Sequence, residues 1–103
     1  MSHIHCIARF QAKSGKIDEL VTSLRKLIPD TLVEDGCVGY NLTREIHYTG
    51  SYGEKWDVCL IEQWKSREDF DLHCSKPYII HFFEHTALHL VEKSDVRLYE
   101  TSV

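Results

Sequence analysis

Four segments of the chain alternate apolar and polar side chains at every second residue, which is typical of strands that bury one face. Three other segments repeat apolar side chains every three or four residues, as helices with one buried side do. The expected strands cover residues 3–13, 37–48, 55–65 and 95–101. The expected helices cover residues 17–28, 67–74 and 78–91.

Proline, glycine and serine mark where several of these elements end. Pro29 lacks a backbone donor, so it should kink or end the first helix and leave residues 30–34 as a looser turn. Gly36 stands where a helix C-cap is expected. Residues 49–54 have the composition of a hairpin loop, and Ser66 can cap the short helix that follows it.

The order of elements is β-α-β-β-α-α-β, which predicts a single α+β domain over residues 1–103 with a ferredoxin-like fold. Its antiparallel sheet should carry helices on one face. The strands are also apolar on their alternate register, at Ile7, Cys59 and Ile61. One layer of helices cannot cover both faces, so we expect a homodimer in which two sheets pack face to face.

Composition narrows the class of protein. The net charge of −4 gives no basic face for nucleic acid, and a hydrophobic fraction of 43% is ordinary for a globular domain. No apolar stretch is long enough to cross a membrane, and the first residues do not resemble a signal peptide. The four cysteines are widely spaced, without a C-x-x-C pair, so we expect reduced thiols in a cytoplasmic protein.

The candidate chemistry lies between residues 62 and 73. Glu62 and Trp64 are two residues apart on a strand, so they point to the same side, and His73 follows on the short helix. A carboxylate, an indole and an imidazole that meet in one cavity would suit proton transfer to a flat aromatic substrate. Alternatively, Glu62 reaches solvent or Arg44, while Trp64 and His73 are ordinary core residues.

A second group of histidines follows one stripe of the last helix. His81, His85 and His89 are four residues apart, and two histidines at this spacing can bind zinc, nickel or copper. The stripe borders the apolar side of the helix, and no carboxylate is an obvious third ligand. We therefore expect a solvated flank and no physiological metal.

Taken together, these motifs resemble the antibiotic biosynthesis monooxygenase family, small dimeric α/β-barrel proteins that include quinol monooxygenases. The resemblance extends over nearly the whole chain. It rests on His73 and on residues 8–15, 34–37, 62–66, 75–77 and 96–99.

The resemblance implies a cavity between the sheet and the helices, with no flavin or metal needed. In such enzymes a base deprotonates a quinol or polyphenol, and the resulting anion itself reacts with O2. His73 or Glu62 would be the base, Trp64 would pack against the ring, and Asn41 would hydrogen-bond the oxyanion. Tyr40, the neighbour of Asn41, is the remaining expected substrate-binding residue. We therefore expect a cofactor-independent monooxygenase.

Other activities occur in this family, and the chain departs from its usual pattern. Tyr78 follows Pro77 where relatives commonly have histidine, and Cys6 replaces an asparagine that haem-degrading members use. Haem remains a possible cofactor, with His81 or His85 as its ligand. The alternatives to a monooxygenase are an isomerase of a small phosphorylated ketone, a haem-degrading oxygenase, or a dimer that binds a small ligand without catalysis.

Overall fold

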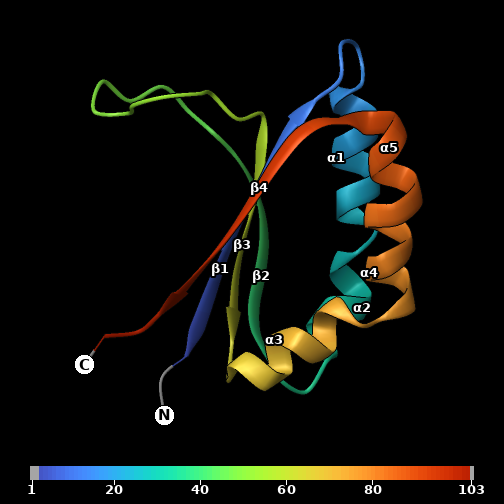
Figure 1. Cartoon of the computed structure of the whole chain (residues 1–103), viewed down its shortest axis with the longest axis vertical. Coiled ribbons are helices and arrows are strands. Elements are labelled where there is room, and N and C mark those ends of the chain that lie inside the picture. Colours follow the sequence, from blue (N-terminus) through green and yellow to red (C-terminus); the bar gives the residue numbers. More distant parts are fainter. Residues whose placement is uncertain (1–2, 103) are drawn as a thin grey trace.

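The computed structural model describes residues 3–102, and its strands form one antiparallel sheet in the order β2-β3-β1-β4. All the helices lie on one face of this sheet (Figure 1), which confirms the predicted ferredoxin-like α+β fold. The strands are β1 Ile4–Ala12, β2 Cys37–Arg44, β3 Val58–Trp64 and β4 Val91–Glu100. The helices are α1 Ile17–Arg25, α2 Ile28–Leu32, α3 Arg67–Cys74, α4 Pro77–His81 and α5 Ala87–Leu90, and the π-helix η1 Phe82–Thr86 joins the last two.

The hydrophobic core lies between the sheet and the helices. Strand β1 has the expected alternation, because every second side chain from Ile4 to Phe10 is buried. Helix α1 packs on it with Leu20 and Leu24, which are fully buried. Burial of one such side chain contributes about 1.5–3 kcal/mol relative to exposure. The main core residues are Ile4, Cys6, Ala8, Phe10, Leu20, Leu24, Leu27, Tyr40, Val58, Leu60, Trp64, Phe70, Ile79, Phe82 and Leu90.

The face of the sheet away from the helices is open in a single chain. Ile61 remains 44% exposed on it, and Ile7 and Cys59 are half-buried, as the alternate register predicted. Alternation over the expected strand 37–48 would put Val38 on the core side with Tyr40, but Val38 is exposed. The register between β2 and β3 shifts at residues 37–39, and this irregularity puts Cys37 opposite Trp64 and turns Val38 outward.

The second and third strands are shorter than the periodicity predicted. Strand β2 ends at Arg44 instead of residue 48, and β3 begins at Val58 instead of residue 55. The side chain of Asp57 explains the late start, because its Oδ2 accepts a hydrogen bond from the Ala12 backbone N–H at 2.7 Å. That bond ties the chain to the end of β1 just before it enters the sheet.

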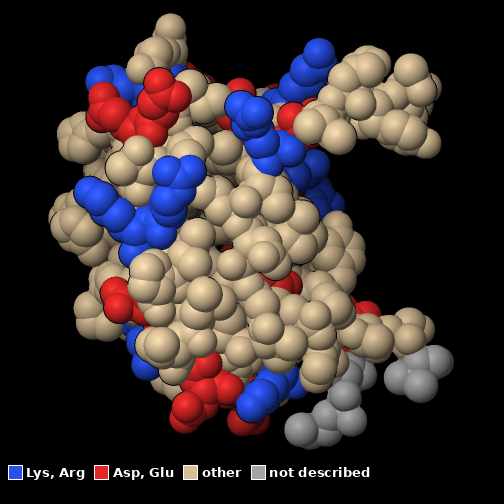
Figure 2. Space-filling model, turned by 180° about the vertical axis from the view of Figure 1, so that it is seen from behind, with Lys and Arg blue, Asp and Glu red and all other residues tan. Residues whose placement is uncertain are grey.

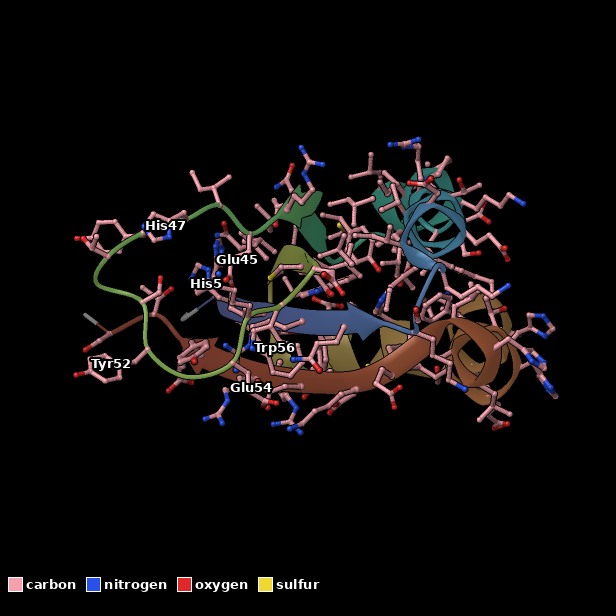
Figure 3. The ribbon with its side chains drawn as sticks, turned by 90° about the horizontal axis from the view of Figure 1, so that it is seen from above. His5, Glu45, His47, Tyr52, Glu54 and Trp56 are labelled. Atoms are coloured by element: carbon pink, nitrogen blue, oxygen red, sulfur yellow. The ribbon has the colours of Figure 1, made fainter. Side chains whose placement is uncertain are left out.

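Residues 45–57 consequently form a longer loop than the expected 49–54. The loop projects beyond the sheet on the side away from the helices (Figures 1 and 3), and Tyr52 at its tip is fully exposed. Alternation over the expected strand 55–65 would put Trp56 on the same face as Glu62. Trp56 lies on the opposite face instead, where the Arg9 guanidinium stands 4.7 Å from the centre of its ring.

Three other expectations about these elements were wrong. Pro29 lies in the first turn of α2, where its missing donor costs nothing, so it starts a helix instead of ending one. The last helix ends at Leu90, close to the expected residue 91, but it is not one regular α-helix because η1 interrupts it. Strand β4 begins at Val91 rather than Asp95, because it pairs with the full length of β1.

Charged side chains of both signs occur in small groups over the face shown in Figure 2, without an extended basic surface on that face. The four cysteines, all within the described part of the chain, are free thiols as expected.

Gly36 is needed for close packing and not as a left-handed helix cap, because its φ is not positive. A Cβ at this position would lie 2.2 Å from Cγ of Asp69 and 2.3 Å from its Cβ. Asp69 cannot easily move away, since its backbone N–H donates to Ser66 Oγ in the predicted N-cap of α3. Gly36 therefore joins the end of α2 to the start of α3.

We predict that Gly36→Ala lowers the free energy of unfolding by about 1–3 kcal/mol through overpacking. Urea denaturation measures this. Gly39→Ala is the matched control, because its new Cβ would contact only Asn41 Nδ2, at an ordinary 3.8 Å. Equal stabilities for the two variants would contradict the packing role of Gly36.

Candidate active site

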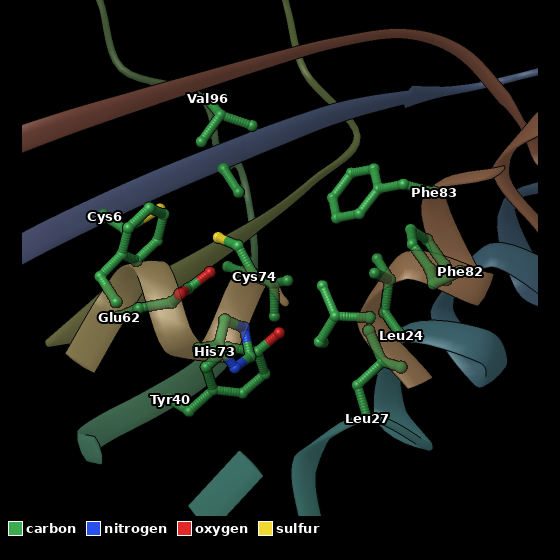
Figure 4. Close-up of a pocket in the computed structure, with 14 residues that line it drawn as sticks. Cys6, Leu24, Leu27, Tyr40, Glu62, His73, Cys74, Phe82, Phe83 and Val96 are labelled. Carbon is green, nitrogen blue, oxygen red and sulfur yellow. The ribbon is translucent and has the colours of Figure 1, made fainter. Parts of the chain in front are cut away.

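A cavity of about 140 Å³ lies between the sheet and the helices (Figure 4). Polar and ionisable side chains, among them Glu62, His73 and Tyr40, gather at one side of it, while Leu24, Phe82 and Phe83 form the other. Its lining consists of Cys6, Ala8, Leu24, Leu27, Tyr40, Leu60, Glu62, Phe70, His73, Cys74, Ile79, Phe82, Phe83 and Val96.

Glu62 reaches this cavity from β3 and is only 5% exposed. Burial raises the pKa of its carboxyl from 4.5 to about 7, because the charged form loses its hydration. Two hydrogen bonds oppose the shift. Trp64 Nε1 donates to Glu62 Oε1 at 3.0 Å, and the Cys6 thiol donates from β1. At neutral pH the carboxyl is therefore close to half protonated.

His73 enters the same cavity from the last turn of α3 and is 3% exposed. Its Nδ1 lies 2.8 Å from Oε2 of Glu34, and its ring centre lies 4.5 Å from that of Trp64. Burial lowers the pKa of His73, and the bond to Glu34 only partly opposes this. With Nδ1 bonded to a carboxylate, the neutral ring carries its proton there and Nε2 is left as the basic nitrogen.

Glu34 is held in place from a second direction. The Tyr78 hydroxyl donates to the same Oε2 of Glu34 and lies 3.1 Å from Oγ1 of Thr31. Thr31 is fully buried and donates in turn to the Leu27 carbonyl at 2.7 Å. These bonds run from α2 through α4 to α3 and fix the carboxylate that orients His73.

Glu34 and Tyr78 are site residues that the sequence analysis did not identify. Both lay within its reach: residues 34–37 form one of the motifs that carry the resemblance, and Tyr78 stands where relatives commonly have histidine. The positions of Glu34 and Tyr78 in the sequence do not reveal that they meet near His73, because this contact depends on how α2 and α4 pack.

The structure brings four of the expected site residues together and leaves one apart. Glu62, His73 and Tyr40 line the cavity, while Trp64 lies behind the first two and contacts both. Asn41 does not reach the cavity. It is exposed and pairs with Ile61 on the open face, because neighbours on a strand point to opposite sides and Tyr40 occupies the inner one.

The histidines of the last helix are less regular than their spacing implied. The rings of His81 and His85 lie 4.9 Å apart, and the π-helix between α4 and α5 disrupts the even stripe. Within residues 3–102 no cluster of three or more His, Cys, Asp or Glu side chains could hold a metal ion. The described helices also include none that is both long enough and apolar enough to span a bilayer.

The fold and the site define a class: small ferredoxin-like domains with a cavity between sheet and helices that is lined in part by buried ionisable side chains. The sequence profile of the antibiotic biosynthesis monooxygenase family matches residues 3–85, and the chain belongs to this family. No curated protein is significantly similar to it.

Several solved structures share this fold. A protein from Shewanella oneidensis is 36% identical, with a TM-score of 0.85 over 97% of this chain and 91% of that one. A crystal structure of an antibiotic biosynthesis monooxygenase is 23% identical, with a TM-score of 0.74 over 97% and 99% of the two chains. A dimeric ferredoxin-like protein from Bacteroides fragilis is 12% identical, with a TM-score of 0.74 over 96% of each. The last two similarities concern the fold alone.

Burial of the Glu62 carboxyl should make stability depend on pH. The pKa of Glu62 is about 7 in the folded protein and 4.5 in the unfolded chain. The contribution of this carboxyl to stability is therefore fully present below pH 4.5, where it is neutral in both states, and is lost as pH rises through 7. Over this interval the free energy of unfolding of the wild type should fall by roughly 3 kcal/mol relative to that of Glu62→Gln, whose side chain stays neutral. Urea denaturation of both proteins at pH 4.5 and pH 8 measures the difference. A difference that is independent of pH would show that Glu62 ionises freely.

Proposed function

We propose that the protein is a cofactor-independent monooxygenase that oxidises a one-ring quinol or phenol with O2. The observation that carries this proposal is the Glu34–His73 pair at the wall of an apolar, ring-sized cavity. A neutral imidazole whose other nitrogen is bonded to a carboxylate is the arrangement that enzymes use for a general base.

The size of the cavity supports a single aromatic ring. An apolar cavity of about 150 Å³ in another protein is known to hold benzene, and the cavity here measures about 140 Å³. A fused three-ring compound or a haem would need several times this space. This argument favours the monooxygenase over the haem-degrading alternative.

In the proposed reaction, His73 Nε2 removes the proton from a ring hydroxyl. Glu34 stabilises the imidazolium that forms. The electron-rich phenolate then passes one electron to O2, and the two radicals join at a ring carbon that carries a hydrogen, ortho to the oxygen or, in a simple phenol, para to it. Loss of water from this hydroperoxide leaves a quinone. One atom of O2 enters the product, the other leaves as water, and the substrate supplies all the electrons.

Glu62 is better suited to be the acid than the base. Its carboxyl already accepts hydrogen bonds from Trp64 and Cys6, and with a pKa of about 7 it is substantially protonated at neutral pH. In that form it can give a proton to the peroxide oxygen that leaves as water. Two groups whose surroundings push their pKa values in opposite directions are typical of an acid–base pair.

Oxygen uptake with a panel of hydroquinols tests the reaction, and ¹⁸O2 shows whether one atom enters the product. His73→Ala should lower turnover by roughly 10²–10⁴-fold, the usual contribution of a general base. His85→Ala is the matched control, because His85 is exposed on η1 and should leave the rate unchanged.

Each outcome of this experiment is decisive. Unchanged turnover in a folded His73→Ala variant, shown by circular dichroism, would remove His73 from the mechanism. Ring binding without oxygen uptake would favour the non-catalytic ligand-binding dimer. A Soret band on addition of haem, with loss of oxygen uptake on hydroquinols, would favour the haem-degrading branch.

We also propose that the protein acts as a homodimer through the open face of the sheet. Ile61 lies at the middle of this face, and the loop of residues 45–57 projects on the same side of the sheet. A second copy packed on this face would cover Ile61. Each subunit would keep its own cavity, because the cavity lies on the helical side of the sheet. The dimeric relative from Bacteroides fragilis has the same fold.

Sedimentation equilibrium at micromolar concentration should therefore give twice the mass of 12.0 kDa. Ile61→Asp should yield monomers, because it places a charge on the buried face of the dimer. Leu88→Asp is the control, as Leu88 is exposed on α5 away from this face. A monodisperse wild-type monomer would refute the dimer.

A further inference from the structure

The cavity opens to the surface through an apolar ring of three residues. Cys74, Phe83 and Val96 are the only exposed members of the described lining, and Phe83 and Val96 are 42% and 48% exposed. We call these three residues the collar. They come from α3, η1 and β4, and Figure 4 shows their side chains around the same space.

The collar carries no charge. The ionisable side chains that the proposed reaction uses, Glu62 and His73, are both buried. Cys74 is exposed at the surface, but its partial desolvation beside the cavity and the nearby Glu62 and Asp71 carboxylates raise the pKa of its thiol to about 11, so the thiol is neutral at physiological pH. A substituent that leaves the cavity here therefore meets a phenyl ring, an isopropyl group and a thiol.

The π-helix positions the aromatic member of the collar. Phe83 is the second residue of η1, and its ring lies 6.2 Å from that of Phe10 and 5.1 Å from that of Phe82. Single π-helical turns often occur at functional sites. These contacts hold Phe83 at the opening although it is partly exposed.

From this geometry we infer that the collar is a subsite for an apolar substituent on the ring. The substrate class is then a one-ring hydroquinol or phenol with an alkyl chain, whose ring lies in the cavity and whose chain extends between Phe83 and Val96. The inference rests on the proposed function only in placing the ring in the cavity.

Anaerobic calorimetric titration tests the subsite without turnover. The probes are hydroquinone, methylhydroquinone, butylhydroquinone and hydroquinone sulfonate. Each methylene that the collar covers should tighten binding by up to about fourfold, and the sulfonate should bind more weakly than hydroquinone. Equal affinity for hydroquinone and butylhydroquinone, or tighter binding of the sulfonate, would overturn the inference.

Variants locate the effect at the collar. Phe83→Ser and Val96→Thr should lose most of the gain from the butyl chain, measured in each variant as the ratio of its affinities for butylhydroquinone and hydroquinone. Leu88→Ser, on exposed α5, is the matched control and should keep the gain. Retention of the full gain in both collar variants would contradict the proposed location.

Thiol labelling is an independent measurement. Butylhydroquinone should slow the reaction of Cys74 with a maleimide at least fivefold, and leave the half-buried Cys37 and Cys59 unaffected. Cys74→Ser identifies the protected thiol. Absence of protection at saturating ligand would overturn the inference. Chain-dependent binding without oxygen uptake would instead refute the proposed function alone.

Discussion

The arrangement of the site depends on the burial of two ionisable side chains, Glu62 and His73, in a largely apolar space. An ionisable group in such a place is costly unless it is hydrogen-bonded or changes its protonation state. Trp64 and Cys6 provide bonds for the carboxyl, while Glu34 provides one for the imidazole. No buried polar side-chain atom of the described residues lacks a hydrogen-bond partner. The network therefore links β1, β3, α3 and the segment after α2 around one cavity.

The same burial gives the two groups different chemistry. Loss of hydration raises the pKa of Glu62 and lowers that of His73, so both tend toward their neutral forms near pH 7. A neutral imidazole can accept a proton and a neutral carboxyl can donate one. In the proposed reaction, the two groups in one cavity would move the protons, while the substrate itself supplies the electrons.

The irregular elements of the fold form the boundary of this cavity. A continuous α-helix from Pro77 to Leu90 would place its side chains in even rows, whereas η1 brings Phe82 and Phe83 to the cavity together. Gly36 allows the chain after α2 to pass close to α3, which keeps Glu34 within reach of His73. Local departures from regular structure thus determine the shape of the site.

Periodicity and local capping rules were sufficient to predict the order of the elements, the inner face of β1 and the cap at Ser66, because these depend on neighbours within a few residues. They left open whether Glu62 and His73 share a cavity, because that depends on how α3 packs against the sheet. Periodicity failed at the ends of β2 and β3, where a bond from Ala12 to Asp57 across 45 residues decides the boundary. Asn41 was assigned to the cavity by the family resemblance and not by periodicity, and it lies on the open face because Tyr40 occupies the inner side of β2. The roles of Glu34 and Tyr78 depend on packing between separate helices, so only the tertiary structure could reveal them.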